Sequence, residues 1–244
     1  MIHPEFEGRF KLLPISLALV SACSQAAFAQ TPIVWNDLNP NLSTAFEDSS
    51  NWFGGVVPAD NLTSHIAVFG GANPHPPNLP NGRQIAGIRF ASSAGSYNFS
   101  GTGTVTLGAA GIDNQDSDST QSLPSLSLGA SVTISNAGNL VLAQFGAIDT
   151  NGHTLTLAGE GTGGTIGGAI RVNAAGILNT GGLVKTGSGT WTLSEDGGGH
   201  DLRGPITVSA GTLILRNVFS GSVPSAEIAS GAILDVKSLD GISG

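Results

Sequence analysis

Apolar and polar residues alternate in short segments that are separated by glycine through most of this chain. In the segment 190–193 (TWTL) apolar residues alternate with threonines, and the alternation recurs at 206–208 (ITV) and around Leu213 and Leu215. Because successive side chains of a strand point to opposite faces, each segment has one apolar face and one polar face. The glycines between the segments predict turns. A unit this short cannot bury its apolar face alone, so it needs a similar unit stacked on it, as in a solenoid.

Similar short segments follow one another from Ile85 onward. The expected strands are 85–90, 97–99, 105–107, 126–128, 132–134, 140–142, Ile148, 155–157, Ile166 and 170–172. Such spacing is compatible with a sandwich, a barrel or a solenoid, and the recurring Thr-Leu-Thr-Leu and Leu-x-Leu-Gly phrases favour the solenoid. We therefore predict an all-β fold, a right-handed parallel β-helix with leucines in an interior column and threonines in an exterior ladder. The segment 230–236 indicates one more coil, so we expect either a truncated chain or an exposed last coil.

Composition supports the all-β prediction. Glycine accounts for 36 of the 244 residues, and charged residues make up 11% of the chain, against about 25% in typical domains. The net charge is −8, and the basic residues beyond the N-terminus are scattered singly. Nucleic-acid binding needs a basic patch that neutralises phosphates. The sequence therefore argues against a nucleic-acid partner.

The first residues have the pattern of an export signal. Arg9 and Lys11 precede an apolar run, and the small-x-small triplet 27–29 (AFA) is typical of a cleavage site. We expect a signal peptide at 1–29 and no membrane span in the mature chain, because the apolar run is short for a span. The alternative is a lipoprotein processing box, 20–23 (VSAC), in which Cys23 would be lipidated.

Residues 30–82 are expected to form an N-terminal cap and a proline-rich loop. Trp35, Trp52 and Phe53 can cover the open edge of the first coil, because unpaired strand edges promote aggregation. The alternative is a sugar-stacking platform that uses the tryptophans. The prolines within 73–81 exclude a regular strand there, and the solenoid is expected over 83–244.

Two segments carry a family resemblance. Residues 181–193 (GGLVKTGSGTWTL) and 206–213 (ITVSAGTL) resemble the autotransporter-associated β-strand repeat, whose core reads G-G-L-x-K-x-G-x-G-T-x-x-L, a loop, then T-x-V-x-A-G-T-L. This places the repeat at 181–215. Ile206 replaces the first threonine of the second half, and 202–204 (LRG) stands where the family often has tyrosine before Thr-Gly.

The resemblance implies a role as well as a fold. Proteins with this repeat are exported passenger-type β-helices, so we expect an extracellular or outer-membrane-surface protein. Its expected function is structural or adhesive and non-catalytic. Surface glycans, or components of a host or neighbouring cell surface, are the expected partners.

Two groups of ionisable residues are candidate sites. Asp113, Asp116 and Asp118 resemble a calcium loop, but the glycine and glutamate that an EF-hand needs are absent, so a solvated polar turn is expected. The densest ionisable group comprises Glu195, Asp196, His200, Asp201 and Arg203. It lies in one glycine-rich loop, which is a poor support for fixed catalytic geometry. We therefore predict no catalytic residue, no cofactor and no metal ligand.

Two rival functions remain open from the sequence. One is a β-helical carbohydrate-active enzyme, a polysaccharide lyase or hydrolase, which would place carboxylates or basic residues at one position of successive coils. The other is a glycan-binding module that uses Trp35 and Trp52.

Overall fold

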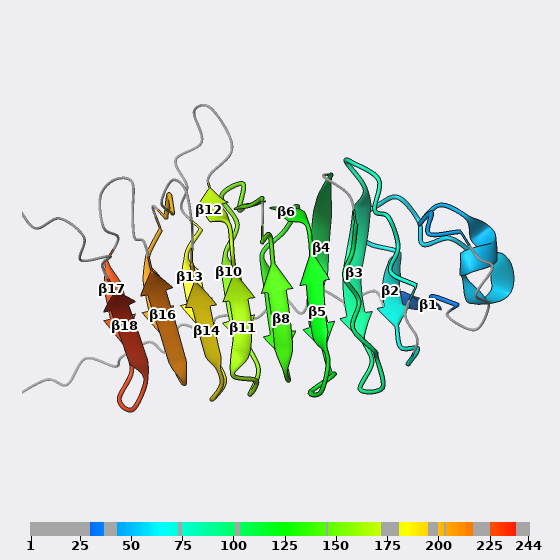
Figure 1. Ribbon diagram of the computed structural model, residues 1–244. Coiled ribbons are helices and arrows are strands. Elements are labelled where there is room, and N and C mark those ends of the chain that lie inside the picture. The colour runs from blue at the N-terminus through cyan, green and yellow to red at the C-terminus, as the bar shows by residue number, and fades with distance from the viewer. Residues whose placement is uncertain are drawn as a thin grey trace, which may run out of the picture.

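The computed structural model describes residues 30–36, 43–72, 75–100, 103–144, 146–171, 181–194, 200–202, 204–216 and 225–237. These residues form strands almost throughout, with two short 3-10 helices near the N-terminal end. Figure 1 shows the strands standing side by side along an elongated molecule, with β1 and β2 at one end and β17 and β18 at the other. Within the described residues, no helix is long and apolar enough to cross a membrane.

The elements follow one another in chain order. They are β1 (Thr31–Val34), η1 (Ser49–Asn51), η2 (Phe53–Gly55), β2 (His65–Phe69), β3 (Gln84–Phe90), β4 (Thr104–Asn114), β5 (Thr120–Leu123), β6 (Ser125–Leu128), β7 (Val132–Asn136), β8 (Asn139–Leu142), β9 (Ala147–Asp149), β10 (Leu155–Ala158), β11 (Gly163–Ile166), β12 (Ala169–Arg171), β13 (Leu183–Lys185), β14 (Thr190–Leu193), β15 (Ile206–Val208), β16 (Thr212–Arg216), β17 (Ala226–Ile228) and β18 (Ile233–Lys237).

The strands form three rows. The first row runs β1-β2-β3-β4-β7-β10-β13-β15-β17, the second runs β5-β8-β11-β14-β16-β18, and β6, β9 and β12 form a third. The long strand β4 joins two rows, because its first part pairs with β6 and its last part with β7. Gly111, at φ 63°, lies between these two parts. The first row also includes β1 and β2, so stacking extends to the N-terminal side of residue 83.

Every paired strand is parallel to the equivalent strand of the next coil. In the first row Leu155 stacks on Val132, and Leu183 in turn stacks on Leu155. Because the side-chain period of a strand is two, this register keeps the same face inward in each coil. The prediction of a parallel β-solenoid is confirmed.

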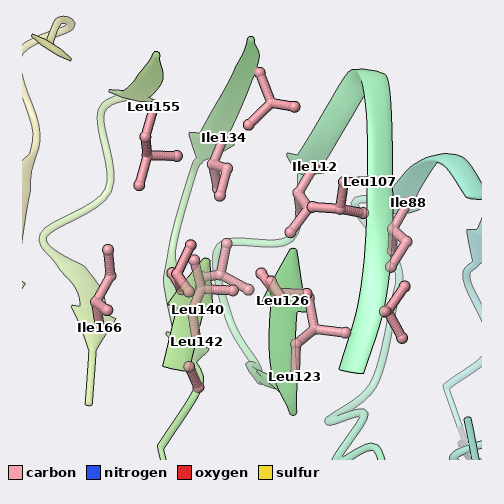
Figure 2. Close-up of a cluster of buried hydrophobic side chains, with 14 of the residues drawn as sticks. Ile88, Leu107, Ile112, Leu123, Leu126, Ile134, Leu140, Leu142, Leu155 and Ile166 are labelled. Atoms are coloured by element: carbon pink, nitrogen blue, oxygen red, sulfur yellow. The ribbon is translucent and has the colours of Figure 1, made fainter. Parts of the chain in front are cut away.

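The core is a column of aliphatic side chains inside the coils. Figure 2 shows ten labelled members, from Ile88 to Ile166, in the space enclosed by the strands, and each is at most 3% exposed. The exterior ladder is also present, because Thr133 pairs with Thr156 on the outer face of the first row. Val184 interrupts this ladder before Thr207.

Aromatic side chains fill the N-terminal end. The rings of Trp35 and Trp52 meet edge to face at 4.9 Å, and both side chains are 2% exposed. Their indole N–H groups donate to the carbonyl oxygens of His75 and Phe46 at 3.0 and 2.7 Å. Phe53 is 49% exposed, so the expectation that it helps to cover this end is wrong. It lies in η2, whose residues are not buried.

Buried Arg83 ties the N-terminal segment to the coils. Its guanidinium donates to Glu47 Oε1 at 2.7 Å and to the carbonyl oxygen of Pro58. The same group lies 5.0 Å from the centre of the Phe46 ring. A desolvated cation over an aromatic face is favourable, so Arg83 joins two segments of the cap, at 46–47 and at Pro58, to the strand that follows.

Most of the expected strands are present, with differences at two places. Residues 97–99 form only an isolated bridge, from Asn98 to Ser122, and a second bridge joins Ser100, just beyond this range, to Asn78. Strands β1, β5, β13 and β17 have no counterpart among the expected strands. The segment 230–236 does form a further coil, because β18 pairs with β16 over five residues.

Candidate functional site

The candidate site lies in two successive coils, one that contains β13 and β14 and one that contains β15 and β16. Within β13 the alternation places Leu183 and Lys185 on the inner face and Val184 on the outer face. Lys185 consequently stacks between Leu157 of the preceding coil and Val208 of the next. A lysine therefore occupies a position of the interior column, and its side chain is 0% exposed.

The ammonium group of Lys185 is bound by backbone oxygens. Nζ donates to the carbonyl oxygens of Thr186, Gly187 and Ala210 at 2.6, 2.7 and 3.1 Å. Burial lowers the pKa of Lys185, and the three acceptors oppose that effect because they stabilise the charged form. We name Lys185, Gly187, Ala210 and Gly211 the repeat corner, since they lie where the chain turns from the first row to the second.

Two glycines of the repeat corner have little room for a side chain. A Cβ at Gly187 would lie 2.5 Å from the carbonyl oxygen of Gly159 one coil earlier. A Cβ at Gly211 would lie 2.4 Å from the carbonyl oxygen of Gly189. Both glycines also have positive φ, 70° and 68°, which other residues rarely adopt. The stacked backbone therefore requires glycine at both positions.

Trp191 provides the largest interior side chain of the coil that contains β13 and β14. Its indole is fully buried and donates from Nε1 to the carbonyl oxygen of Ala158 at 3.0 Å. The ring lies over Gly164 of the preceding coil, where a Cβ would come within 2.5 Å of it. Gly164 thus leaves the space that the indole fills.

His200 is the one member of the predicted ionisable cluster whose described side chain is buried. It is 1% exposed, and Nδ1 accepts the backbone N–H of Ile170 at 3.1 Å. Burial lowers the pKa of His200 to about 4, so the imidazole is neutral at neutral pH. The next residue, Asp201, also bonds to β12, because its backbone N–H donates to the carbonyl oxygen of Ile170. Glu195, Asp196 and Arg203 lie outside the described residues, as does Cys23.

The expected solvated turn at the three aspartates is wrong in part. Asp113 belongs to β4, and Asp116 is only 2% exposed. Its carboxylate accepts the backbone N–H groups of Asp118 and Ser119 at 3.2 and 3.0 Å and the amide of Gln121 at 2.9 Å. The turn folds inward because these donors satisfy the buried carboxylate. Among the described residues no group of three His, Cys, Asp or Glu is arranged to hold a metal ion.

The tryptophans do not form a sugar-stacking platform. Stacking on a sugar needs an exposed ring face, whereas Trp35 and Trp52 are each 2% exposed and contact one another. A cavity of about 270 Å³ lies in the N-terminal segment. It is lined by Thr44, Ala45, Phe46, Glu47, Asn78 and Pro80.

Sequence reasoning missed the role of Lys185. A lone lysine is ordinarily read as a solvated surface residue, because lysine is almost never fully buried. The signal was nevertheless available, since Lys185 is two residues from Leu183 and therefore shares its face in a strand.

Comparison with known protein families finds one match. A family model described as the passenger-associated-transport-repeat matches residues 183–215, which span β13 to β16 and include the repeat corner. No curated protein and no solved structure matches the chain. The matched repeat and the parallel coils agree with one another, and the chain therefore fits an autotransporter-associated β-strand repeat protein.

Proposed function

We propose that this chain is an exported, non-catalytic passenger segment that acts at the cell surface as a structural or adhesive element. The observation that supports this most directly is the use of the polar groups in the matched repeat. Lys185, Trp191 and His200 are buried and bonded to backbone atoms. These groups hold coils together, and their burial keeps them from an external ligand.

The outer faces supply the surface of such an element. On the first row Thr133, Thr156 and Thr207 face outward, and on the second row Thr165 pairs with Thr192. Threonine hydroxyls both donate and accept hydrogen bonds. Such ladders suit contact with the hydroxyl-rich glycans of a cell surface, which is the partner class that we propose.

A second candidate, a β-helical carbohydrate-active enzyme, has one specific observation in its favour. Strands β9 and β12 place Asp149 and Arg171 in register on adjacent coils. Carbohydrate-active β-helices collect charged residues in this way, although the pair here contains one carboxylate only. Two carboxylates are the usual requirement for glycoside hydrolysis, so we favour the non-catalytic role.

Export is tested by expressing the gene in a bacterium with two membranes and labelling intact cells with an antibody against the solenoid. We expect surface labelling, and loss of the protein when protease is added to intact cells. Retention in the cytoplasm would contradict the proposal. A chain that lacks residues 1–29 is the matched control for the predicted signal peptide.

Adhesion and catalysis are separated by two assays on the purified protein. We expect binding to immobilised surface glycans that weakens in Thr133→Glu and Thr156→Glu, while circular dichroism shows that both variants remain folded. Release of reducing ends or unsaturated products from acidic polysaccharides, lost in Asp149→Asn, would overturn the non-catalytic assignment.

A further inference from the structure

We infer that the repeat contains a built-in cation site, in which the ammonium group of Lys185 occupies a position made by backbone carbonyl oxygens of two successive coils. The site is selective for a primary ammonium group. This inference concerns how the coils are joined, and it stands whether or not the surface role proposed above is correct.

Donors and acceptors match in number at this site. A lysine ammonium has three N–H donors and no acceptor, and Nζ has three carbonyl oxygens at 2.6, 2.7 and 3.1 Å. Two of these oxygens belong to the corner after β13, and the third belongs to Ala210, in the corner after β15. The group therefore joins two coils through a complete set of hydrogen bonds.

The charge is balanced by backbone dipoles. Within the described part of the chain the salt bridges involve Arg83 and Arg89, and none involves Lys185. Convergent carbonyl oxygens can replace the hydration shell of a cation. The three oxygens at the repeat corner act in this manner toward Nζ.

The glycines complete the site. A Cβ at Gly211 would lie 2.7 Å from Nζ of Lys185, in addition to its contacts with backbone oxygens. The lysine, the glycine two residues after it and the Ala-Gly step of the second half are consequently parts of one arrangement. A free metal ion bound by the same oxygens would leave this position of the interior column unfilled. The butyl stem of Lys185 fills it between Leu157 and Val208.

The unaltered protein gives the first test. Nuclear magnetic resonance on ¹⁵N-lysine-labelled protein detects Nζ protons only where exchange with water is slow. We expect a separate Lys185 ammonium signal at neutral pH, with nuclear Overhauser contacts to the Gly211 backbone. A Lys185 Nζ that exchanges as fast as the other lysines would overturn the inference, and this readout requires no variant to fold.

Chemical rescue gives the second test. Lys185→Ala removes the atoms that n-propylammonium contains, so we expect this variant to melt roughly 5–10 °C lower than the unaltered protein and to recover part of that loss, saturably, with n-propylammonium. Lys185→Met fills the column without a charge and is expected to be destabilised and not rescued. Arg216→Ala removes an exposed cation from the next coil, and the melting temperature of this variant should not change with the amine.

The rescue must be specific to count in favour of the site. Tetramethylammonium has no N–H donor and is expected to have no effect on Lys185→Ala. An equal stabilisation of all variants by n-propylammonium, or none of Lys185→Ala, would contradict a cation site and leave Lys185 as ordinary packing.

Discussion

The corner between the first and second rows is built in two ways in different parts of the molecule. In the middle coils buried amides close it: Asn114 donates from Nδ2 to Oδ1 of Asn136 at 2.8 Å, and Asn136 donates to the carbonyl oxygen of Gly138 at 2.8 Å. In the repeat the equivalent turn contains Gly187, and Lys185 supplies the donors. Both corners satisfy buried backbone oxygens.

The middle corner and the repeat corner differ in charge and in the room that their side chains need. An asparagine amide is neutral at every pH and needs room for its own side chain, whereas Lys185 reaches the corner from the interior column. Glycine can then bring the backbones of successive coils together, as at Gly187 and Gly159. The middle corner depends on side-chain pairing, and the repeat corner depends on close backbone approach around a cation.

The largest expected effect is that of filling the repeat corner. Gly211→Ala would place a Cβ 2.4 and 2.5 Å from two backbone oxygens, which cannot move away without separating the coils. We expect a loss of about 4 kcal/mol in the free energy of unfolding, measured by chemical denaturation.

Gly231→Ala is the matched control, because Gly231 has φ 82° and no atom within 4 Å of a Cβ. It should lose only about 1 kcal/mol through its backbone conformation. Equal losses in the two variants would show that backbone conformation, and not close approach, makes glycine necessary.

Acid is expected to lower the free energy of unfolding through His200. The unfolded chain binds a proton on this imidazole near pH 6.5 and the folded chain near pH 4, so the unfolded state holds more protons between these values. Stability from this group is present above pH 6.5 and lost as the pH falls toward 4, by about 3 kcal/mol in total.

The measurement is the difference between the unaltered protein and His200→Asn, unfolded by denaturant from pH 7 to pH 4. Carboxylates titrate in both proteins, so the difference isolates the imidazole. Parallel pH profiles would mean that His200 does not stay neutral in the folded coil.

Breaking the asparagine pair of the middle corner should reduce the free energy of unfolding by less. Asn136→Leu leaves the Asn114 amide and the Gly138 backbone groups without their partner, and we expect a loss of about 2 kcal/mol. Asn139→Leu, at an exposed position of β8, serves as the control and should be close to neutral. A larger loss at Asn139 would indicate that the outer face contributes more than the corner.

The smallest effect is expected on the outer face of the coils. Arg89 and Asp113 form an ion pair at 3.1 Å with side chains 39% and 37% exposed, and solvent screens such a pair. Arg89→Ala should change the free energy of unfolding by about 0.5 kcal/mol or less. A loss that rivals Asn136→Leu would reverse the ranking of corner over surface.

The coils could be predicted from the sequence, because alternation in β7, β10 and β14 has the period of a strand and repeats between glycines. Like residues then stack on like, which the Leu155 and Leu183 pairing shows. Local pattern was enough for these elements, since each strand needs only the equivalent strand of the next coil.

The candidate site was harder to predict from the sequence. The environment of Lys185 is made by carbonyl oxygens of three residues, one of them a whole coil away, and backbone atoms carry no sequence signal. Asp116 was misread for a similar reason, because its burial depends on Gln121 and on backbone donors. Phe53 was assigned to the cap by residue type, which does not specify its direction.

The in-register first row has a consequence for length. Adjacent strands in a sheet lie about 4.8 Å apart, so the described path of nine strands from β1 to β17 measures roughly 40 Å. Residues inserted between strands leave that measure unchanged, because only a further coil extends it. The length of the row therefore changes only in steps of one whole coil.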